Sequence, residues 1–322
     1  MRVKVKKISG DASFRKFFLT EKESKKTVIV YADKEKFKNL ITYAAINSFL
    51  RKNGIKTPKT ISNHYKKNFI EIEYLGSNSL VHQIQSRRNI LKSYKKLIEI
   101  LAKFQRIKII KSLKYKSFKI FIQDYNVNKL HAESDLFFEW YLPYFFSRKK
   151  SNQIKRILRK ELDKLYRSLN FKNKVMVHRD FHASNVMIYK NNYYLIDSQD
   201  LIIGNPLYDL VSLVDDVRVK TSLQIKNQLI KYSYKFYKKR MSYSEYLKNF
   251  HILSLQRNLK ILGIFTRLFV RDGKPDYFNF MPNTWNLIAL RLRNPYLKTI
   301  ASLLNKFVNK KTRRIKSHHE TK

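Results

Sequence analysis

The feature that most constrains this chain is the segment KVMVHRDFHASNVMIYKNNYYLIDSQD, residues 174 to 200. It contains three short apolar runs, KVMVH, NVMIY and YYLID, whose composition is typical of β-strands. The run KNN between the second and third is typical of a tight hairpin turn. The first two runs enclose a polar loop that carries Asp180 and Asn185, and Asp197 stands at the end of the third. The sequence therefore predicts a strand, a loop and a hairpin that hold these three side chains at strand ends.

The spacing within this segment points to a chemistry. From His178 to Asn185 the chain fits H-R-D-x-x-x-x-N, and Asp197 follows Asn185 by 12 residues (197 − 185). In phosphoryl transfer, an aspartate so placed orients a hydroxyl and accepts its proton, while an amide oxygen and a second carboxylate hold Mg²⁺ against ATP phosphates. We therefore expect Asp180 as the catalytic base, Asn185 and Asp197 as metal ligands, and ATP and Mg²⁺ as cofactors.

A simpler interpretation is that these polar residues only close a turn. The ordered set between strands favours the catalytic interpretation over that one. We expect His178 to brace the loop by hydrogen bonds. Arg179 and His182 stay open between loop packing and contact with phosphate or substrate.

The first ninety residues have the pattern of a small sheet with one helix. FRKFFLT, KTVIVYA and NFIEIEYL are predicted strands, and the helical spacing between Asp33 and Asn53 ends at Gly54, giving the order β-β-α-β-β. From Ser79 the pattern is mainly helical to about Val308, with the segment above as an interruption. A chain of 322 residues suits two lobes around a cleft. We predict an N-terminal nucleotide-binding lobe (1–76), a C-terminal catalytic and substrate lobe (77–308) and a disordered basic tail (309–322).

Charge and cysteine content bear on partners and compartment. There are 68 Lys and Arg residues against 24 Asp and Glu, a formal charge of +44, which invites a nucleic-acid or membrane partner. The basic residues are spread over every segment, so a solvated surface is the favoured interpretation, with polyanion contact by this surface or the tail as the alternative. Cysteine is absent, no apolar export signal follows the N-terminus, and no run reaches about 18 apolar residues. We expect a cytoplasmic protein without a membrane span and without an obligate nucleic-acid partner.

The loop and the following LIDSQDLIIGNPLYDLVSLVDD resemble the aminoglycoside phosphotransferase and choline kinase superfamily. Within it, GDASFRKFF, EYLGSNSL and residues 255 to 282 resemble the bacterial N-acetylmuramate/N-acetylglucosamine anomeric kinases of cell-wall recycling. The resemblance runs from about Gly10 to about Pro282. It implies an α+β, two-lobed protein-kinase-like fold with a small β-rich N-terminal lobe and a larger, mostly helical C-terminal lobe.

The resemblance also implies roles for further residues. Asp209 would support the catalytic loop, although a carboxylate in the first turn of a helix is also favoured by the helix dipole. The loop around Gly10 and Ser13 would lie over the phosphates, and Leu75 would offer backbone groups to adenine. The acceptor would be bound by cationic and other polar side chains, for which the candidates are Gln199, Asp200, Arg257, Asn258, Arg267 and Arg271.

Several departures limit what carries over. TVIVYAD lacks the strand lysine of V-A-I-K, so Arg15, Lys26 or Lys34 would contact the phosphates instead. Asp197-Ser198-Gln199 replaces Asp-Phe-Gly, and no A-P-E segment follows, which argues against a protein substrate.

These observations predict an ATP-dependent kinase of a small sugar, with the anomeric hydroxyl of N-acetylmuramate or N-acetylglucosamine as acceptor. A kinase of another small alcohol, such as an aminoglycoside or amino-alcohol, is the alternative enzyme. A kinase-like protein without turnover that binds polyanions is the alternative of a different class.

Overall fold

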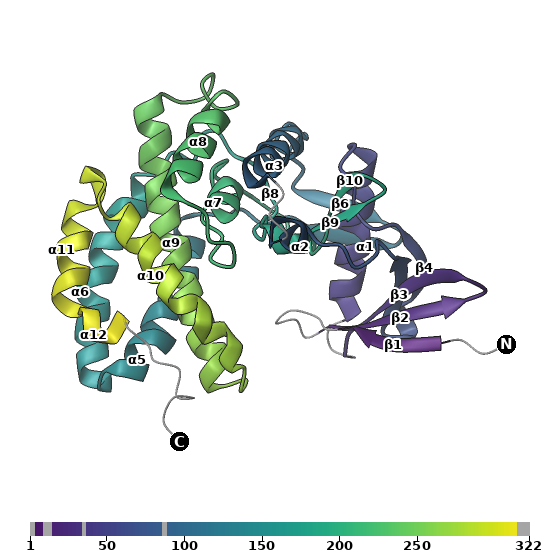
Figure 1. The fold of residues 1–322 in the computed structure, drawn as a ribbon, viewed down its shortest axis with the longest axis horizontal. Helices are drawn as coiled ribbons and strands as arrows, with labels where there is room; N and C mark the ends of the chain where they lie inside the picture. The colour runs from purple at the N-terminus through teal and green to yellow at the C-terminus, as the bar shows by residue number, and fades with distance from the viewer. Residues whose placement is uncertain (1–3, 9–14, 34–36, 86–88, 314–322) are drawn as a thin grey trace. The chain divides into compact units, whose positions relative to one another are not determined.

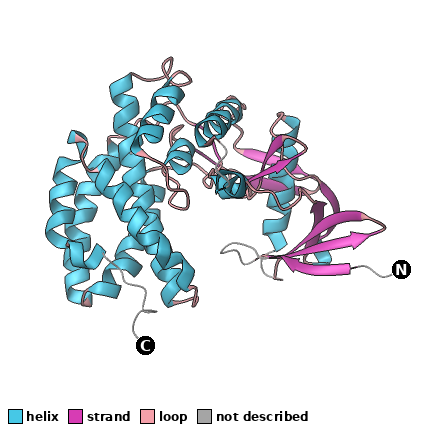
Figure 2. Cartoon of the chain, in the orientation of Figure 1, coloured by secondary structure: helices cyan, strands magenta, loops and turns pink. Residues whose placement is uncertain are grey.

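The computed structural model describes residues 4–8, 15–33, 37–85 and 89–313. The chain forms two compact units, each of which is described by itself. Unit 1 comprises residues 1–123 and 175–203, and unit 2 comprises residues 124–174 and 204–322. Figure 2 shows that the strands belong mainly to unit 1 and that helices make up most of unit 2.

Unit 1 is built on a five-stranded antiparallel sheet in the order β1-β2-β3-β5-β4 (Figure 1). Its strands are β1 (Lys4–Ile8), β2 (Lys16–Lys22), β3 (Lys25–Tyr31), β4 (Thr60–His64) and β5 (Phe69–Glu73), with helix α1 (Phe37–Lys52) between β3 and β4. The three strands that the sequence named and the helix are all present, and the predicted order β-β-α-β-β is found as β2-β3-α1-β4-β5. The predicted stop of the helix is confirmed by Gly54, whose φ of +74° lies in the region that glycine adopts most easily.

Alternating burial explains how the sheet holds α1. In register, Val28 lies opposite Ile72 and Val30 opposite Ile70, and all four side chains are buried. They form one cluster with Leu40 and Tyr43 of α1 and with Ala32. Because successive strand residues point to opposite faces, this period-two pattern turns one face of the sheet towards the helix.

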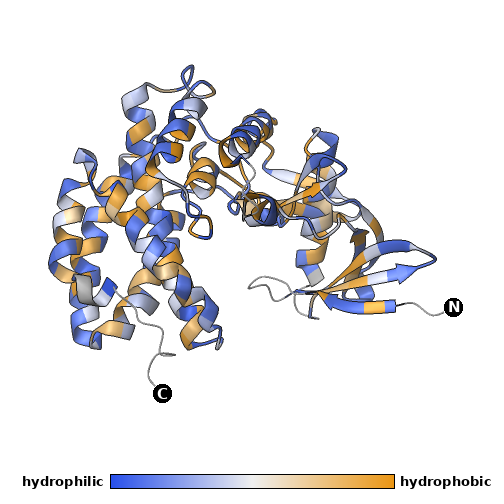
Figure 3. Ribbon diagram, in the orientation of Figure 1, coloured by the Kyte–Doolittle hydropathy of each residue, from blue (hydrophilic) through white to orange (hydrophobic). Residues whose placement is uncertain are grey.

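Two strand pairings were missing from the prediction. Strand β1 has the sequence KVKKI and is largely exposed, and Figure 3 shows it as mostly hydrophilic. Such an edge strand carries no apolar signal, since only its backbone pairing with β2 defines it. The hairpin β6 (Ser112–Tyr115) and β7 (Phe118–Phe121) is likewise short and mostly exposed.

The remaining helices and strands of unit 1 either precede the segment 174–200, form part of it or follow it directly. They are α2 (Leu80–Gln85), α3 (Ile90–Phe104), β8 (Val175–Val177), β9 (Val186–Tyr189), β10 (Asn192–Leu195) and β11 (Ile202–Gly204). β9 and β10 form the predicted hairpin, with Lys190 and Asn191 at φ +48° and +57°. Two positive φ values in a two-residue turn match the type that suits the twist of the flanking strands.

Unit 2 is helical and is organised around the 28-residue helix α9. Its helices are α4 (Val127–Leu136), a π-helical turn (Phe137–Tyr141), α5 (Leu142–Phe145), α6 (Arg148–Arg167), α7 (Tyr208–Val214), α8 (Leu223–Tyr234), α9 (Tyr243–Val270), α10 (Met281–Arg291), α11 (Lys298–Phe307) and α12 (Lys310–Arg313). All seven residues of α7 are buried, and Figure 3 shows this helix as hydrophobic. Buried residues of α9 likewise point to several neighbours at once, which is expected of a helix in the interior of a bundle.

Gly263 lies where α9 approaches the junction of α4 and the π-helical turn. A Cβ atom added to it would lie 2.2 Å from the carbonyl carbon of Leu136 and 2.6 Å from the backbone nitrogen of Phe137. Both are backbone atoms, which cannot rotate away. Only glycine therefore allows the two helices to come this close.

The C-terminal tail begins with a short helix that the sequence analysis did not predict. α12 covers Lys310–Arg313, within the range 309–322 whose disorder stays a prediction. The hydroxyl of Tyr141 donates to the carbonyl of Thr312 at 2.6 Å, and the guanidinium of Arg313 lies 4.8 Å from the ring centroid of Trp285. Residues 314–322 lie outside the described part of the chain.

The units do not divide at the predicted lobe boundary, because contacts place residues 77–123 and 175–203 with the N-terminal sheet. Backbone hydrogen bonds contribute to this grouping: Ile188 donates to Asn78 at 2.9 Å and Leu195 donates to Lys56 at 2.8 Å. The assignment of lobes to residues 1–76 and 77–308 stays a prediction. Among the helices of the described ranges, none has the length and apolar character needed to cross a bilayer.

Candidate active site

The loop after β8 is a compact turn closed on the backbone of Asp180. The carbonyl of Asp180 accepts from the backbone N–H of His182 at 3.1 Å and from Asn185 Nδ2 at 3.0 Å. The hydrogen bond from Nδ2 fixes the orientation of the Asn185 amide. Its Oδ1 accepts no hydrogen bond from the described residues. The side chains of Asp180 and Asn185 are both half-buried. This leaves an amide oxygen available for a ligand.

Asp197 follows β10 and is contacted by a basic residue that comes from the far end of the sequence. Arg15 Nη2 forms an ion pair with Asp197 Oδ1, and Arg15 Nη1 donates to Gln199 Oε1 at 3.0 Å. Gln199 Nε2 also donates to Asp197 Oδ1 at 3.1 Å and to Asp200 Oδ2 at 3.0 Å. Asp197 Oδ2 accepts nothing from the described residues, and the Asp197 side chain is 36% exposed. One oxygen of this carboxylate is thus held in place while the other stays available.

His178 is buried at the start of the loop, and its predicted role in bracing the loop by hydrogen bonds stays a prediction. Its ring lies 6.5 Å from that of Phe104 and 6.1 Å from that of Phe181, in edge-on geometry. Burial lowers the pKa of His178, and this outweighs the opposing effects of Asp180, Asp197 and Asp200. A neutral imidazole packed between aromatic rings fixes the start of the loop.

Helix α1 contacts Ser198 and Arg15 through two of its side chains, and the sequence analysis did not predict these contacts. Asn47 Oδ1 accepts from Ser198 Oγ at 2.6 Å, and the Tyr43 ring centroid lies 5.5 Å from the Arg15 guanidinium. Burial raises the pKa of Tyr43 to about 12, so it stays a neutral phenol near this pair. Tyr43 and Asn47 are one helical turn apart, and that spacing was the only available signal.

Two residues of the site have left-handed backbone angles. Arg179 has φ +76° and Asp197 has φ +63°. Such angles cost energy in residues with a Cβ and are found mainly where the surroundings enforce them, often at functional sites. They indicate that the loop and the end of β10 are held in shape by their neighbours.

The residues predicted to contact the nucleotide are only partly within the described structure. Gly10, Ser13 and Lys34 lie outside the described residues. Leu75 follows β5 and is buried. Lys26 is exposed and lies 3.9 Å from Glu21 on the outer part of the sheet. Of the three basic candidates, Arg15 is the one whose described position is beside Asp197.

The candidates in unit 2 have contacts within that unit. Asp209 is buried in the first turn of α7. Arg257 is buried and its Nε donates to Ser212 Oγ at 2.5 Å, while Asn258 is buried and donates to the carbonyl of Ser254 at 2.8 Å. Arg271, by contrast, is exposed at the end of α9, where its Nε binds the neighbouring Asp272 at 2.7 Å. The structure therefore does not bring Arg271 together with Arg257 and Asn258.

The available oxygens of Asn185 and Asp197 are of the kind that binds Mg²⁺. Among the described residues no group of three or more His, Asp or Glu side chains could hold a metal ion. Asn185 Oδ1 and Asp197 Oδ2 are hard oxygens without hydrogen-bond partners in that part of the chain. Mg²⁺ is commonly held by one or two protein oxygens, with water and substrate phosphates as its other ligands. The residues fit such an ion, provided that a nucleotide completes its coordination.

The chain is similar to known proteins over most of its length. The family model described as the phosphotransferase enzyme family matches residues 4–242. The chain is 24% identical over 305 residues to the N-acetylmuramate/N-acetylglucosamine kinase of Pseudomonas aeruginosa, which covers 92% of this chain and 86% of that protein. It is 26% identical over 302 residues to the protein of the same name from Pseudomonas putida, with 92% and 86% covered.

Solved structures agree on the fold. A choline/ethanolamine kinase family protein from Mesorhizobium loti has a TM-score of 0.60 at 13% identity, covering 94% of this chain and 92% of that chain. A choline kinase from Streptococcus pneumoniae has a TM-score of 0.58 at 15% identity, covering 92% and 93%. The predicted fold class is confirmed by this likeness together with the observed antiparallel sheet and helical unit.

Proposed function

Because the chain belongs to the phosphotransferase enzyme family, we propose that it transfers the γ-phosphoryl group of ATP to the anomeric hydroxyl of an N-acetylated amino sugar, N-acetylmuramate or N-acetylglucosamine. The observation that carries the reaction type is the ordered set Asp180, Asn185 and Asp197 on one loop and hairpin. One oxygen of Asn185 and one of Asp197 accept no hydrogen bond from the residues that the structure describes. The acceptor is supported by the names of relatives that match most of the chain.

In this proposal Asp180 orients the sugar hydroxyl and accepts its proton as the phosphorus–oxygen bond forms. Asn185 and Asp197 would hold Mg²⁺, which supplies charge neutralisation on the phosphates when it is bound. His178 and Asp209 would support the loop, and the Gly10 and Ser13 loop and Leu75 would contact the nucleotide. Gln199 and Asp200, beside Asp197, and the Arg257 and Asn258 region would contribute to the acceptor site.

Arg15 takes the part that a strand lysine has in related kinases. It is a buried cation directly before β2, the strand next to the one where that lysine would stand, and it already contacts Asp197 and Gln199. A guanidinium can donate to a phosphate through two N–H groups, so Arg15 can exchange part of its contact with these residues for the nucleotide. The contact with Asp197 supports a phosphate-binding role for Arg15, whereas Lys26 is exposed beside Glu21 and Lys34 lies outside the described residues.

The test is an ATP-consumption assay on purified protein with N-acetylmuramate, N-acetylglucosamine, an aminoglycoside and choline, followed by phosphorus NMR of the product. We expect turnover with the amino sugars and a phosphate on the anomeric oxygen. Asp180→Asn is the matched control: it keeps size and hydrogen bonding but removes the base, so kcat should fall by about 10²- to 10⁴-fold with nucleotide binding retained. Turnover with only choline or the aminoglycoside would overturn the acceptor, and near-normal turnover of Asp180→Asn would overturn the base.

A further inference from the structure

A basic groove in unit 2 is lined by residues that have no role in the site assigned above. It has a volume of about 760 Å³ and lies along α6, with Asn128 and His131 of α4 on its other side. Its lining includes one carboxylate, Asp163, and five cationic side chains, namely Lys155, Arg156, Arg159, Lys160 and Arg167. We define these five residues as the α6 cation row.

Part of the α6 cation row is not neutralised by the protein. Arg167 Nε binds Asp163 at 2.6 Å, and Arg159 Nε binds Asp135 at 3.2 Å. The remaining members, Lys155, Arg156 and Lys160, form no ion pair or side-chain hydrogen bond with the described residues. The carboxylates beside the groove therefore already have cationic partners, and three positive charges stay available to a ligand.

The one carboxylate in the lining does not oppose an anion. Hydrogen bonds from Arg167 and then from His131 lower the pKa of Asp163, so it stays ionised and keeps these partners. The negative charge of Asp163 is compensated by these two partners within the protein. The open charge of the groove is consequently positive.

The arrangement is linear. The five cations lie at positions 155, 156, 159, 160 and 167 of one helix, which places them along about 18 Å at about 1.5 Å per residue. Asn128 and Asn152 add exposed amide groups that can donate to phosphate oxygens. A row of cations in a hollow suits an extended chain of negative charges more than a single ion.

The composition of the lining distinguishes among extended anions. It contains no apolar or Phe, Tyr or Trp side chain, and none of the exposed large hydrophobic residues lies in it. Peripheral membrane binding uses apolar side chains inserted beside the basic ones, so an anionic bilayer is disfavoured. Duplex nucleic acid is read by elements that protrude into its grooves, whereas a positively charged hollow tracks a single strand.

We propose that the α6 groove binds a single strand of nucleic acid through its phosphates, without reading its bases. Contacts to phosphate carry no sequence information, and no aromatic platform for base stacking lines this groove. The inference does not depend on the proposed sugar kinase activity.

The experiment uses the full chain and a fluorescein-labelled single-stranded RNA of mixed sequence, with anisotropy measured between about 50 mM and about 200 mM salt. The groove variant is Lys155→Glu with Arg156→Glu and Lys160→Glu, where glutamate keeps the helix propensity of α6. We expect at least a tenfold weaker affinity and a plot of log K against log salt whose slope is shallower by about 2, from three lost phosphate contacts in a single strand.

The matched control is Lys231→Glu with Lys238→Glu and Lys239→Glu, which changes the net charge equally at exposed positions that do not line the groove. It should retain most of the binding, and ATP turnover should be unaffected in both variants. An equal loss in both variants would show that overall charge binds the RNA and would overturn the proposal. Tighter binding of duplex RNA than of single-stranded RNA would also overturn the proposal. So would a groove variant that still binds the RNA but no longer binds vesicles of phosphatidylcholine and phosphatidylserine.

Discussion

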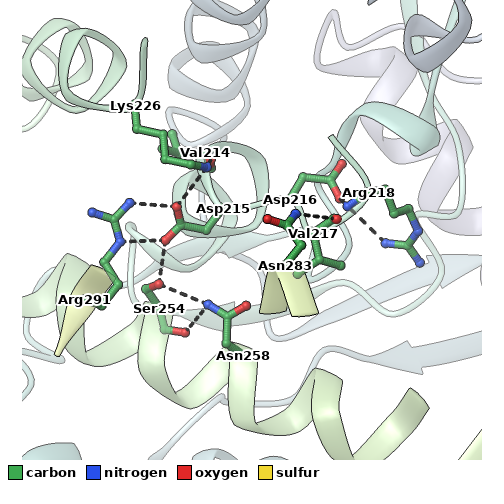
Figure 4. A network of polar contacts seen from close by, with 10 residues as sticks. All are labelled: Val214, Asp215, Asp216, Val217, Arg218, Lys226, Ser254, Asn258, Asn283 and Arg291. Atoms are coloured by element: carbon green, nitrogen blue, oxygen red, sulfur yellow. Dashed lines mark hydrogen bonds and ion pairs between the residues drawn. The ribbon is translucent and has the colours of Figure 1, made fainter. Parts of the chain in front are cut away.

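Two charged clusters, one in each unit, use similar residue types in opposite ways. In unit 1, Asp197 is partly exposed, paired with Arg15 on one oxygen only, and has a left-handed backbone. In unit 2, Asp215 is fully buried at the end of α7 and both of its oxygens are bound (Figure 4). Arg291 contacts the two oxygens at 2.7 and 2.8 Å, Lys226 contacts one at 3.3 Å, and Ser254 donates to the other at 2.6 Å.

The electrostatics of the Asp215 cluster explain its structural role. Burial by itself would raise the pKa of Asp215, but Arg291 and Lys226 outweigh burial and hold the pKa below its ordinary range. The cluster joins α7, α8, α9 and α10 through one carboxylate (Figure 4). The Asp215 cluster, with every oxygen bound and no exposure, maintains the fold. Asp197 is partly exposed, and its Oδ2 has no partner among the described residues, which leaves it open to a ligand.

Exchanging aspartate for asparagine at both positions should separate these roles most strongly. Asp215→Asn leaves Arg291 and Lys226 as buried charges without compensation, so the free energy of unfolding should fall by about 3–5 kcal/mol. Asp197→Asn should cost less stability, because Asp197 is 36% exposed and Arg15 keeps its hydrogen bond to Gln199. It should reduce kcat by roughly 100-fold or more, because charge at the phosphates is lost. Chemical denaturation and kinetics of the folded fraction measure the two. Equal loss of stability in both variants would contradict the distinction.

Arg15 sharpens the comparison on the cationic side. Arg15→Ala removes a charge-assisted contact, and we expect kcat/KM for ATP to fall about 10- to 100-fold. Lys26→Ala is the control, because Lys26 is exposed on the same sheet and lies 3.9 Å from Glu21. An equal fall in kcat/KM in Lys26→Ala would contradict the assignment of the phosphate contact to Arg15.

Gly263→Ala tests packing in unit 2 apart from charge. Alanine favours helix by about 1 kcal/mol over glycine, but its Cβ would meet the backbone of Leu136 and Phe137. Overpacking against atoms that cannot rotate should prevail, with a net loss of about 1–3 kcal/mol in unfolding free energy. Val270→Ala, at an exposed position of the same helix, should change it by less than about 0.5 kcal/mol. A more stable Gly263→Ala protein would show that α9 can move away.

A further effect is a dependence of stability on pH. Burial, and then Arg291, lowers the pKa of His251 to about 4 from an ordinary 6.5, with Asp215 opposing. Between those two values the unfolded chain binds more protons than the folded one, so stability should fall as pH falls from 6.5 towards 4. Asp215 adds a further loss below its ordinary pKa of 3.8. Thermal unfolding across this range measures the slope, and His251→Asn should make it flatter; an unchanged slope would assign the protons elsewhere.

Local patterns predicted much of the fold and of the site. The strands β2, β3 and β5, helix α1 and the β9–β10 hairpin followed from alternation, helical spacing and turn residues over short windows. Strand β1 could not be predicted, because its exposed side chains carry no pattern and it is defined by pairing with β2. The short helix in the tail was missed for a similar reason, since Tyr141 and Trp285, which contact it, are distant in sequence.

By itself the sequence determined the order and spacing of Asp180, Asn185 and Asp197, because one loop and one hairpin carry all three and their chemistry is local. Only the tertiary structure placed Arg15 beside Asp197, since this contact joins positions 182 residues apart. It also brought Tyr43 and Asn47 of α1 beside that pair. The physical reason is that the charge and the hydrogen bonds of a side chain act over a few ångströms in space, and the fold alone decides which distant residues lie within that range.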